Sequence, residues 1–284
     1  MTPPQKPPRE HDLGLEYDLG TLRRRNVLRL FAGAGFAALA GCAADNNASE
    51  SASPGTTTSS TPSASASSST TTSASTDVDE IPQETSGPYP GDGSNGPNVL
   101  TESGIVRSDI TKSFGTASGV ATGVSLTVEL TILDADKDAG LAGAAVYLWH
   151  CDAQGRYSLY SDGATEENYL RGVQAADSSG KVTFTTIFPA AYSGRWPHIH
   201  FEVYSSLSEA TAAGKISATS QLALPKDVCS TVYATDGYDG SAQNLAQTSL
   251  ENDNVFGDDD GVHQLATVTG DVDNGYVAKL NVGV

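Results

Sequence analysis

The sequence HIHFEV occupies residues 198–203, directly after Pro197. Its apolar residues alternate strictly with its polar ones, and a period of two is typical of a β-strand. Because residues i and i+2 of a strand point to the same side, His198 and His200 present both imidazoles on one face while Ile199 points away. Two neighbouring imidazoles suit a transition metal such as iron, copper or zinc. An isolated H-x-H pair is a weak signal for a metal, and two hydrogen-bonded surface histidines are the alternative.

Further short apolar runs surround this stretch and predict additional strands, at residues 126–132, 144–151, 182–188, 265–269 and 276–282. Residues typical of turns, among them Gly, Pro, Asn and Asp, separate these runs. Helical periodicity is weak, and a helix is indicated only near residues 206–213. The pattern predicts an all-β protein whose residues 78–284 form one β-sandwich around a single core.

The charge of the 284-residue chain is uneven. Its net charge is −18, from 16 Lys and Arg against 34 Asp and Glu. Residues 1–41 hold six basic and four acidic residues, whereas the rest of the chain holds ten and thirty, a net −20. This balance argues against binding to nucleic acid, which requires a basic face, and against electrostatic docking on anionic lipids.

Residues 1–41 are expected to be an export signal. Arg24 and Arg25 precede the 11-residue apolar stretch 30–40, which is too short to span a bilayer of about 30 Å as a helix. A basic region before a short apolar core indicates a signal peptide, and the paired arginines resemble the twin-arginine signal. The sequence LAGC at residues 39–42 resembles a bacterial lipobox, which would make Cys42 the lipidated first residue. A signal peptide cut by chance near a cysteine is the alternative.

The next segment, residues 42–77, is rich in Ser, Thr, Ala and Pro. Such a composition cannot bury enough apolar surface to offset the entropy of ordering, so it predicts a disordered stalk. Signal peptide, stalk and sandwich together indicate a lipoprotein exported to the extracellular face of the cell membrane, or a secreted protein. No transmembrane span is expected in the mature chain.

Two cysteines, Cys151 and Cys229, belong to the predicted sandwich. In an oxidising compartment the simplest expectation is one disulfide between them. A bond closing so long a loop would stabilise the fold by roughly 4 kcal/mol. Two reduced, buried thiols are the alternative.

Three motifs occur in order over this region. The first motif is W-x(5)-G-x-Y, formed by Trp149, Gly155 and Tyr157. The second is G-x-V-x-F-x-T-x-x-P-x-x-Y, formed by Gly180, Val182, Phe184, Thr186, Pro189 and Tyr192. The third is R-x-x-H-x-H, formed by Arg195, His198 and His200. Together they resemble the intradiol ring-cleavage dioxygenases, the family of protocatechuate 3,4-dioxygenase and catechol 1,2-dioxygenase, over roughly residues 82–205.

The resemblance implies a non-haem Fe(III) cofactor held by Tyr157, Tyr192, His198 and His200. Phenolate is a hard anionic donor that favours ferric iron, and coordination lowers the phenol pKa from about 10. Taken alone, each tyrosine would be interpreted as a half-buried residue with a hydrogen-bonded hydroxyl. The paired tyrosines argue against zinc or copper.

The implied reaction cleaves a catechol with O2 between its two hydroxylated carbons and yields a cis,cis-muconate-type diacid. Tyr192 would be displaced by the substrate and take up a proton, and Arg195 would stabilise developing negative charge. A solvent-exposed arginine is the alternative for Arg195. Residues 85–89 resemble a stretch that covers the family's pocket, so Gly87, Pro88 and Tyr89 are predicted to bind substrate; a simple Gly-Pro turn is the alternative.

Three other features are expected to be structural. Arg171 and His150 are interpreted as supporting residues, and the acidic run 258–260 as a solvated turn, since it lacks the spaced ligands of a Ca²⁺ loop. A non-catalytic β-sandwich lipoprotein that binds aromatic compounds is the alternative function. Neither the particular catechol nor the oligomeric state follows from the sequence.

Overall fold

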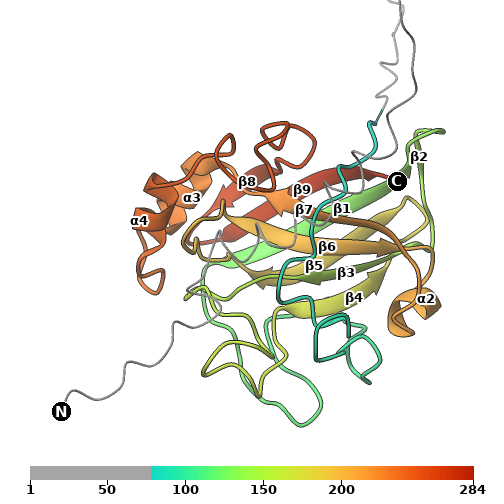
Figure 1. Ribbon diagram of the computed structural model, residues 1–284, viewed down its shortest axis with the longest axis horizontal. Helices are drawn as coiled ribbons and strands as arrows, with labels where there is room; N and C mark the ends of the chain where they lie inside the picture. Colours follow the sequence, from blue (N-terminus) through green and yellow to red (C-terminus); the bar gives the residue numbers. More distant parts are fainter. Residues whose placement is uncertain (1–77) are drawn as a thin grey trace, which may run out of the picture.

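The computed structural model describes residues 78–284. The predicted signal peptide, Cys42 and the predicted stalk lie outside the described residues. The elements are β1 (Ser125–Asp134), β2 (Ala139–Gly140), β3 (Ala145–Trp149), β4 (Arg171–Ala175), β5 (Lys181–Ile187), β6 (His198–Tyr204), α2 (Leu207–Thr211), β7 (Ile216–Ala223), α3 (Lys226–Val232), α4 (Ser241–Ala246), β8 (Thr267–Asp271) and β9 (Gly275–Gly283). Strands lie at the centre of Figure 1 and the short helices at its margins.

The strands form two sheets. In the first, the order is β2-β1-β9-β8, and β5 also pairs with β1. Leu126 of β1 lies opposite Thr186 in the antiparallel β5 pairing and opposite Tyr276 in the parallel β9 pairing. The second sheet has the antiparallel order β4-β3-β6-β7. The predicted all-β sandwich is confirmed.

Strand β1 shows how the alternating pattern builds the core. The residues at every second position of this strand are apolar and fully buried, namely Leu126, Val128, Leu130 and Ile132. The residues between these four are partly exposed. The alternation of polar and apolar residues therefore corresponds to a solvent face and a core face, as predicted.

Strand β6 differs because both of its faces are buried along its whole length. The indole of Trp149, on the neighbouring strand β3, stacks on the His200 imidazole with ring centroids 5.0 Å apart. The backbone at Gly87 approaches the same imidazole from the N-terminal segment. The histidine face of β6 is thus enclosed by protein rather than open to bulk solvent.

The predicted helix near residues 206–213 is confirmed as α2, whose N-cap Ser206 accepts a hydrogen bond from the Glu209 N–H at 3.2 Å. Strands β4 and β7 and helices α3 and α4 were not predicted. In β7 the buried residues include polar side chains such as Ser220 and Gln221. Because hydrogen bonds rather than an apolar face accommodate them, this strand has no alternating pattern.

The disulfide predicted between Cys151 and Cys229 is wrong, because both residues are free, buried thiols. The Cys151 Sγ lies 3.6 Å from the Ala190 carbonyl oxygen, and the Cys229 thiol interacts with the Tyr233 side chain. Burial raises the pKa of both thiols, which keeps them protonated and unreactive. Both cysteines therefore act as small core residues.

Addition of a reductant is expected to leave the melting temperature of the protein unchanged, because no cross-link is present to break. Loss of a disulfide worth roughly 4 kcal/mol would instead lower it by about 8 to 16 °C in a domain of this size. Differential scanning calorimetry with and without dithiothreitol distinguishes the two results. A drop in that range would show that the bond forms.

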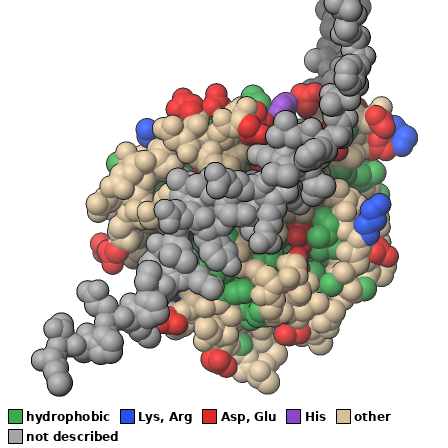
Figure 2. All heavy atoms as spheres, in the orientation of Figure 1, with side chains coloured by type: hydrophobic (Ala, Val, Ile, Leu, Met, Phe, Trp, Pro, Cys, Tyr) green, Lys and Arg blue, Asp and Glu red, His purple; other side chains and the backbone are tan. Residues whose placement is uncertain are grey.

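Acidic side chains are spread over the visible face of the molecule, and lysines and arginines are few (Figure 2). This distribution agrees with the acidic balance of the sequence. Within residues 78–284, no helix is both long enough and apolar enough to cross a membrane.

Candidate metal centre

Four polar atoms converge beside the start of β6. The Tyr157 and Tyr192 hydroxyl oxygens lie 3.4 Å apart, and the Tyr192 oxygen lies 3.1 Å from His198 Nε2. His198 Nε2 in turn lies 3.1 Å from His200 Nε2. The structure therefore brings together all four residues that the sequence proposed as metal ligands.

Strand geometry positions the two histidines, and tight loops position the two tyrosines. Tyr157 follows β3 in a loop organised by Asp152, whose Oδ1 accepts hydrogen bonds from the Gln154 and Arg156 N–H groups, both at 2.9 Å. Gly155 has φ +76°, and a Cβ there would lie 3.4 Å from the Tyr192 Cβ, so the loop crosses close to the second tyrosine. A glycine suits this left-handed backbone.

The same aspartate connects the two loops through its backbone. Its carbonyl oxygen accepts a hydrogen bond from the Ala190 N–H at 3.2 Å, two residues before Tyr192. Asp152 thus positions the segments that carry both phenols.

The protonation of His198 follows from its contacts. Its Nδ1 faces the Trp196 carbonyl oxygen, which can only accept, so Nδ1 carries the proton and Nε2 presents a lone pair. Burial is the largest cause that lowers the pKa of His198, to about 3, and burial also lowers the pKa of His200 well below its usual value. Both imidazoles are therefore neutral, which is the form that binds metals.

The spacing of the four donor atoms fits a single metal ion. Ligands about 2.0 to 2.1 Å from a metal, separated by angles near 90 to 110°, lie about 2.9 to 3.4 Å from each other. The measured separations are 3.1 to 3.4 Å. With the proton of His200 on Nδ1, the His198 and His200 Nε2 lone pairs face each other at 3.1 Å, an arrangement that a shared cation would stabilise.

The chemistry of the donors fits ferric iron. Burial raises the pKa of Tyr157 well above 10, so this phenol ionises only when a strong positive charge lies beside it. Residues 78–284 contain no group of three or more His, Cys, Asp or Glu side chains placed to hold a metal. The converging donors are two imidazoles and two phenols, a set that suits hard Fe(III) better than zinc, which prefers Cys and His.

Arg195 is buried rather than solvent-exposed. Its Nε donates to Asp253 Oδ2 at 3.0 Å, and its Nη2 donates to Gln221 Oε1 at 2.7 Å. Its positive charge contributes to lowering the pKa of both histidines, so it acts on the two imidazole donors. Asp253 and Gln221 are partners that the sequence did not indicate, because neither belongs to a motif.

The N-terminal segment covers the site, as the sequence proposed for residues 85–89. Gly87 has φ +72°, and a Cβ there would lie 3.2 Å from His200 Cε1. The Tyr89 ring centroid lies 5.0 Å from that of Tyr157. Pro88 lies between them and is partly exposed. Gly87 and Tyr89 therefore lie next to the candidate ligands.

His150 and Arg171 have supporting positions. The His150 ring nitrogens contact the Cys151 carbonyl oxygen at 2.8 Å and Thr186 Oγ1 at 2.7 Å, so neither nitrogen is available to a metal. Arg171 Nη1 donates to the Pro90 carbonyl oxygen at 2.8 Å, and its Nη2 donates to the Ser158 carbonyl oxygen at 2.9 Å. Arg171 thus links the covering N-terminal segment to the loop after Tyr157.

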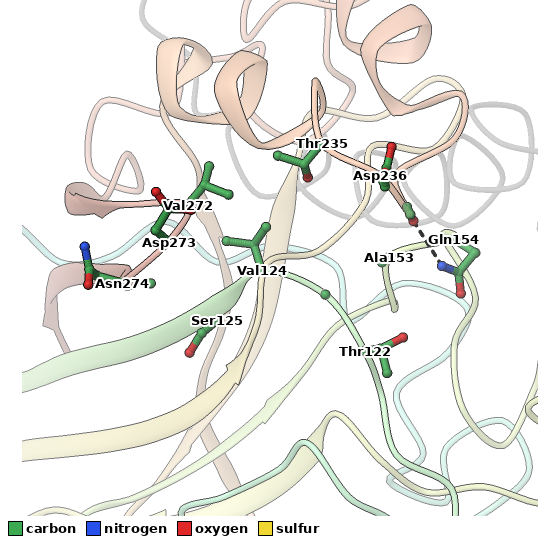
Figure 3. A pocket seen from close by; sticks show the side chains of 13 residues that line it. Thr122, Val124, Ser125, Ala153, Gln154, Thr235, Asp236, Val272, Asp273 and Asn274 are labelled. Atoms are coloured by element: carbon green, nitrogen blue, oxygen red, sulfur yellow. Dashed lines mark hydrogen bonds between the residues drawn. The ribbon is translucent and has the colours of Figure 1, made fainter.

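A separate hollow of about 610 Å³ lies between the start of β1, the loop before Tyr157 and the β8–β9 turn (Figure 3). Its wall consists mainly of hydroxyl, amide and carboxylate side chains, and Gln154 Nε2 donates to the Gly237 carbonyl oxygen at 3.0 Å beside it. None of the four candidate ligands lines this hollow. The candidate reaction centre is therefore assigned to the donor cluster.

The chain is similar to known dioxygenases in sequence and in fold. Residues 95–227 match the family model described as "Dioxygenase". The structure is similar to the intradiol ring-cleavage dioxygenase from Tetranychus urticae, with a TM-score of 0.56 and 24% identity over 72% of this chain and 94% of that one.

Two bacterial structures give weaker matches. The dioxygenase domain of a dioxygenase carbohydrate-binding protein fusion from Streptomyces sp. SirexAA-E has a TM-score of 0.47 and 20% identity over 72% of this chain and 98% of that one. Catechol 1,2-dioxygenase from Acinetobacter sp. ADP1 has a TM-score of 0.41 and 17% identity over 72% of this chain and 62% of that one. Residues 95–227 thus match a dioxygenase family model, and the sandwich that contains them has the fold of the intradiol ring-cleavage dioxygenases.

Proposed function

We propose that this protein is a non-haem Fe(III) intradiol dioxygenase that cleaves a catechol between its two hydroxylated carbons, using O2, to give a cis,cis-muconate-type diacid. The observation that carries the proposal is the convergence of two phenol oxygens and two imidazole nitrogens within 3.1 to 3.4 Å of their neighbours. When bound, a ferric ion would withdraw electrons from a catecholate and make its ring reactive toward O2. Tyr157, Tyr192, His198 and His200 would hold it.

The two tyrosines differ in a way that suits different roles. Tyr157 is 2% exposed, whereas Tyr192 is only partly buried. A partly exposed phenol can turn away at lower cost when a substrate arrives, and its oxygen can then accept a proton from a catechol hydroxyl. We assign Tyr192 as the displaceable base and Tyr157 as the permanent ligand.

Arg195 provides a positive charge at the same site. Its guanidinium is held by hydrogen bonds to Asp253 and Gln221, so it does not have to reorganise during the reaction. A preoriented cation in a site shielded from water stabilises negative charge on a reacting substrate far more than it would in solution. Gly87 and Tyr89 would form the wall against which the aromatic ring lies.

Incubation of the iron-loaded protein with catechol and ¹⁸O2 tests this function. We expect consumption of one O2 per catechol and a cis,cis-muconate product carrying both labelled atoms, identified by mass spectrometry. Binding of catechol without consumption of O2 would instead support the non-catalytic aromatic-binding lipoprotein. An extradiol aldehyde product would also contradict the proposal.

The location of the protein is a separate proposal that depends on residues 1–77. The twin-arginine-like signal and the lipobox-like sequence around Cys42 support a lipid-anchored, exported enzyme. Fractionation of cells expressing the full chain tests this, with Cys42→Ser as the comparison. Loss of the substituted chain from the membrane fraction is expected, and an unchanged distribution would contradict the anchor.

A further inference from the structure

Asp253 lies outside residues 95–227, the part of the chain that matches the dioxygenase model, yet it makes direct contact with the site. Its side chain has no exposed surface. Oδ2 accepts hydrogen bonds from Arg195 Nε at 3.0 Å and from the Trp196 N–H at 2.6 Å. Oδ1 accepts from the Val255 N–H at 2.9 Å and the Phe256 N–H at 3.2 Å.

The two carboxylate oxygens therefore have different tasks. Oδ1 stabilises the turn that carries Asp253 itself, and Oδ2 holds the residues that lead into strand β6. Arg195 and Trp196 directly precede Pro197 and His198, so the contact is two residues from a candidate ligand. The Phe256 ring, whose centroid lies 6.0 Å from the Arg195 guanidinium carbon, packs on the same side chain.

Arg195 is consequently restrained from two directions. Asp253 fixes its Nε and Gln221 fixes its Nη2, and these partners come from different elements, the loop after α4 and strand β7. A long arginine side chain normally has many rotamers, and fixing it before the substrate arrives removes an entropic cost from the reaction. The buried carboxylate also offsets the cost of burying the guanidinium, which stays ionised.

We propose that Asp253 is a positioning residue that orients the Arg195 guanidinium toward the reacting substrate, so that the C-terminal loop after α4 completes the active site. This inference rests on the proposed function. It assigns a role in catalysis to a residue outside the three sequence motifs.

Asp253→Asn is the informative substitution because it keeps the shape of the side chain and removes its charge. If the amide oxygen continues to accept from Val255 and Phe256, the amide NH₂ faces the Arg195 and Trp196 donors, and the hold on Arg195 is lost. We expect kcat to fall on the order of tenfold to a hundredfold, which is typical of a misplaced catalytic group. The Kd for 4-nitrocatechol, measured by absorbance titration, is expected to change less than threefold, and the iron content is expected to be unchanged.

A double-mutant cycle separates this role from a merely structural one. If Asp253 acts through Arg195, the double variant R195Q/D253N is expected to be no slower than R195Q. Asp134→Asn, which removes the partner of Lys137 in an exposed pair, is the matched control and is expected to retain wild-type kcat. If D253N does not fold, Asp253→Glu replaces it in the double-mutant cycle. This variant keeps the negative charge but moves the carboxylate by one methylene group.

Provided that the wild-type enzyme is active, either of two results would overturn the inference. One is a kcat for D253N within twofold of the wild-type value. The other is a kcat for R195Q/D253N that is lowered by the product of the two single effects, which would mean that the residues act independently. Failure of the proposed function is distinguishable, because the iron-loaded wild-type protein would then not cleave catechol. The positioning role would fall with it.

Discussion

Replacing His200 with alanine is expected to remove iron from the protein and to abolish ring cleavage. His200 supplies one of the four converging donors, and its ring is held by stacking on Trp149 with an interplanar angle of 5°. Loss of one of four ligands weakens metal binding. Without a firmly bound cation beside them, the two phenols keep their protons and do not act as ligands. Metal analysis of the purified variant should show less than a tenth of the wild-type iron content, with kcat below detection.

His150 offers a matched control for this substitution. It is also a buried histidine, next to Trp149 on the chain, but its two nitrogens are used by Cys151 and Thr186. His150→Gln is therefore expected to lower the melting temperature while retaining iron and turnover. Iron loss in H150Q with retention in H200A would show that the metal is bound elsewhere.

Replacing Arg195 with glutamine is expected to have the second-largest effect, and to affect both rate and stability. Removal of a preoriented electrostatic donor costs on the order of 10² to 10³ in kcat. Asp253 would also remain buried without its cation, and breaking a buried ion pair from one side costs about 3 to 5 kcal/mol. In a domain of this size that loss lowers the melting temperature by roughly 6 to 20 °C.

Steady-state kinetics and calorimetry on R195Q measure the two effects separately. Arg195→Lys is expected to recover little activity, because an ammonium group cannot reproduce the two fixed guanidinium contacts. Lys181, which pairs with Glu129 at the surface at 2.9 Å, supplies the control. Lys181→Gln should cost at most about 1 kcal/mol. Wild-type kcat in R195Q would remove Arg195 from the mechanism.

The parts of the fold that were predictable are those in which a pattern of side chains reflects one physical environment. Strand β1 has one core face and one solvent face, so its apolar residues alternate. The pair His198 and His200 was predictable for the same reason, since strand geometry alone puts both rings on one side. The two tyrosines came from the family resemblance and not from any periodicity.

The parts that were not predictable depend on contacts between distant segments. Strand β7 buries polar side chains because Gln221 bonds both to Arg195 and, at 2.9 Å, to the Thr85 carbonyl oxygen. Asp253 is 58 residues from Arg195 along the chain, and a single aspartate in a polar loop gives no local signal of its partner. The predicted disulfide between Cys151 and Cys229 was wrong. The number of cysteines and the inferred compartment do not determine where the two Sγ atoms lie in the core, and a disulfide requires a specific geometry.

The most direct test of the central claim, that two phenols and two imidazoles hold ferric iron at a catechol site, is the visible spectrum of the iron-loaded wild-type protein during titration with catechol under anaerobic conditions. Tyrosinate bound to Fe(III) should give a red colour, with one iron per chain. Addition of catechol should shift the band, and H200A should show neither the colour nor the shift. A colourless protein that retains no iron after iron-replete expression would contradict the account.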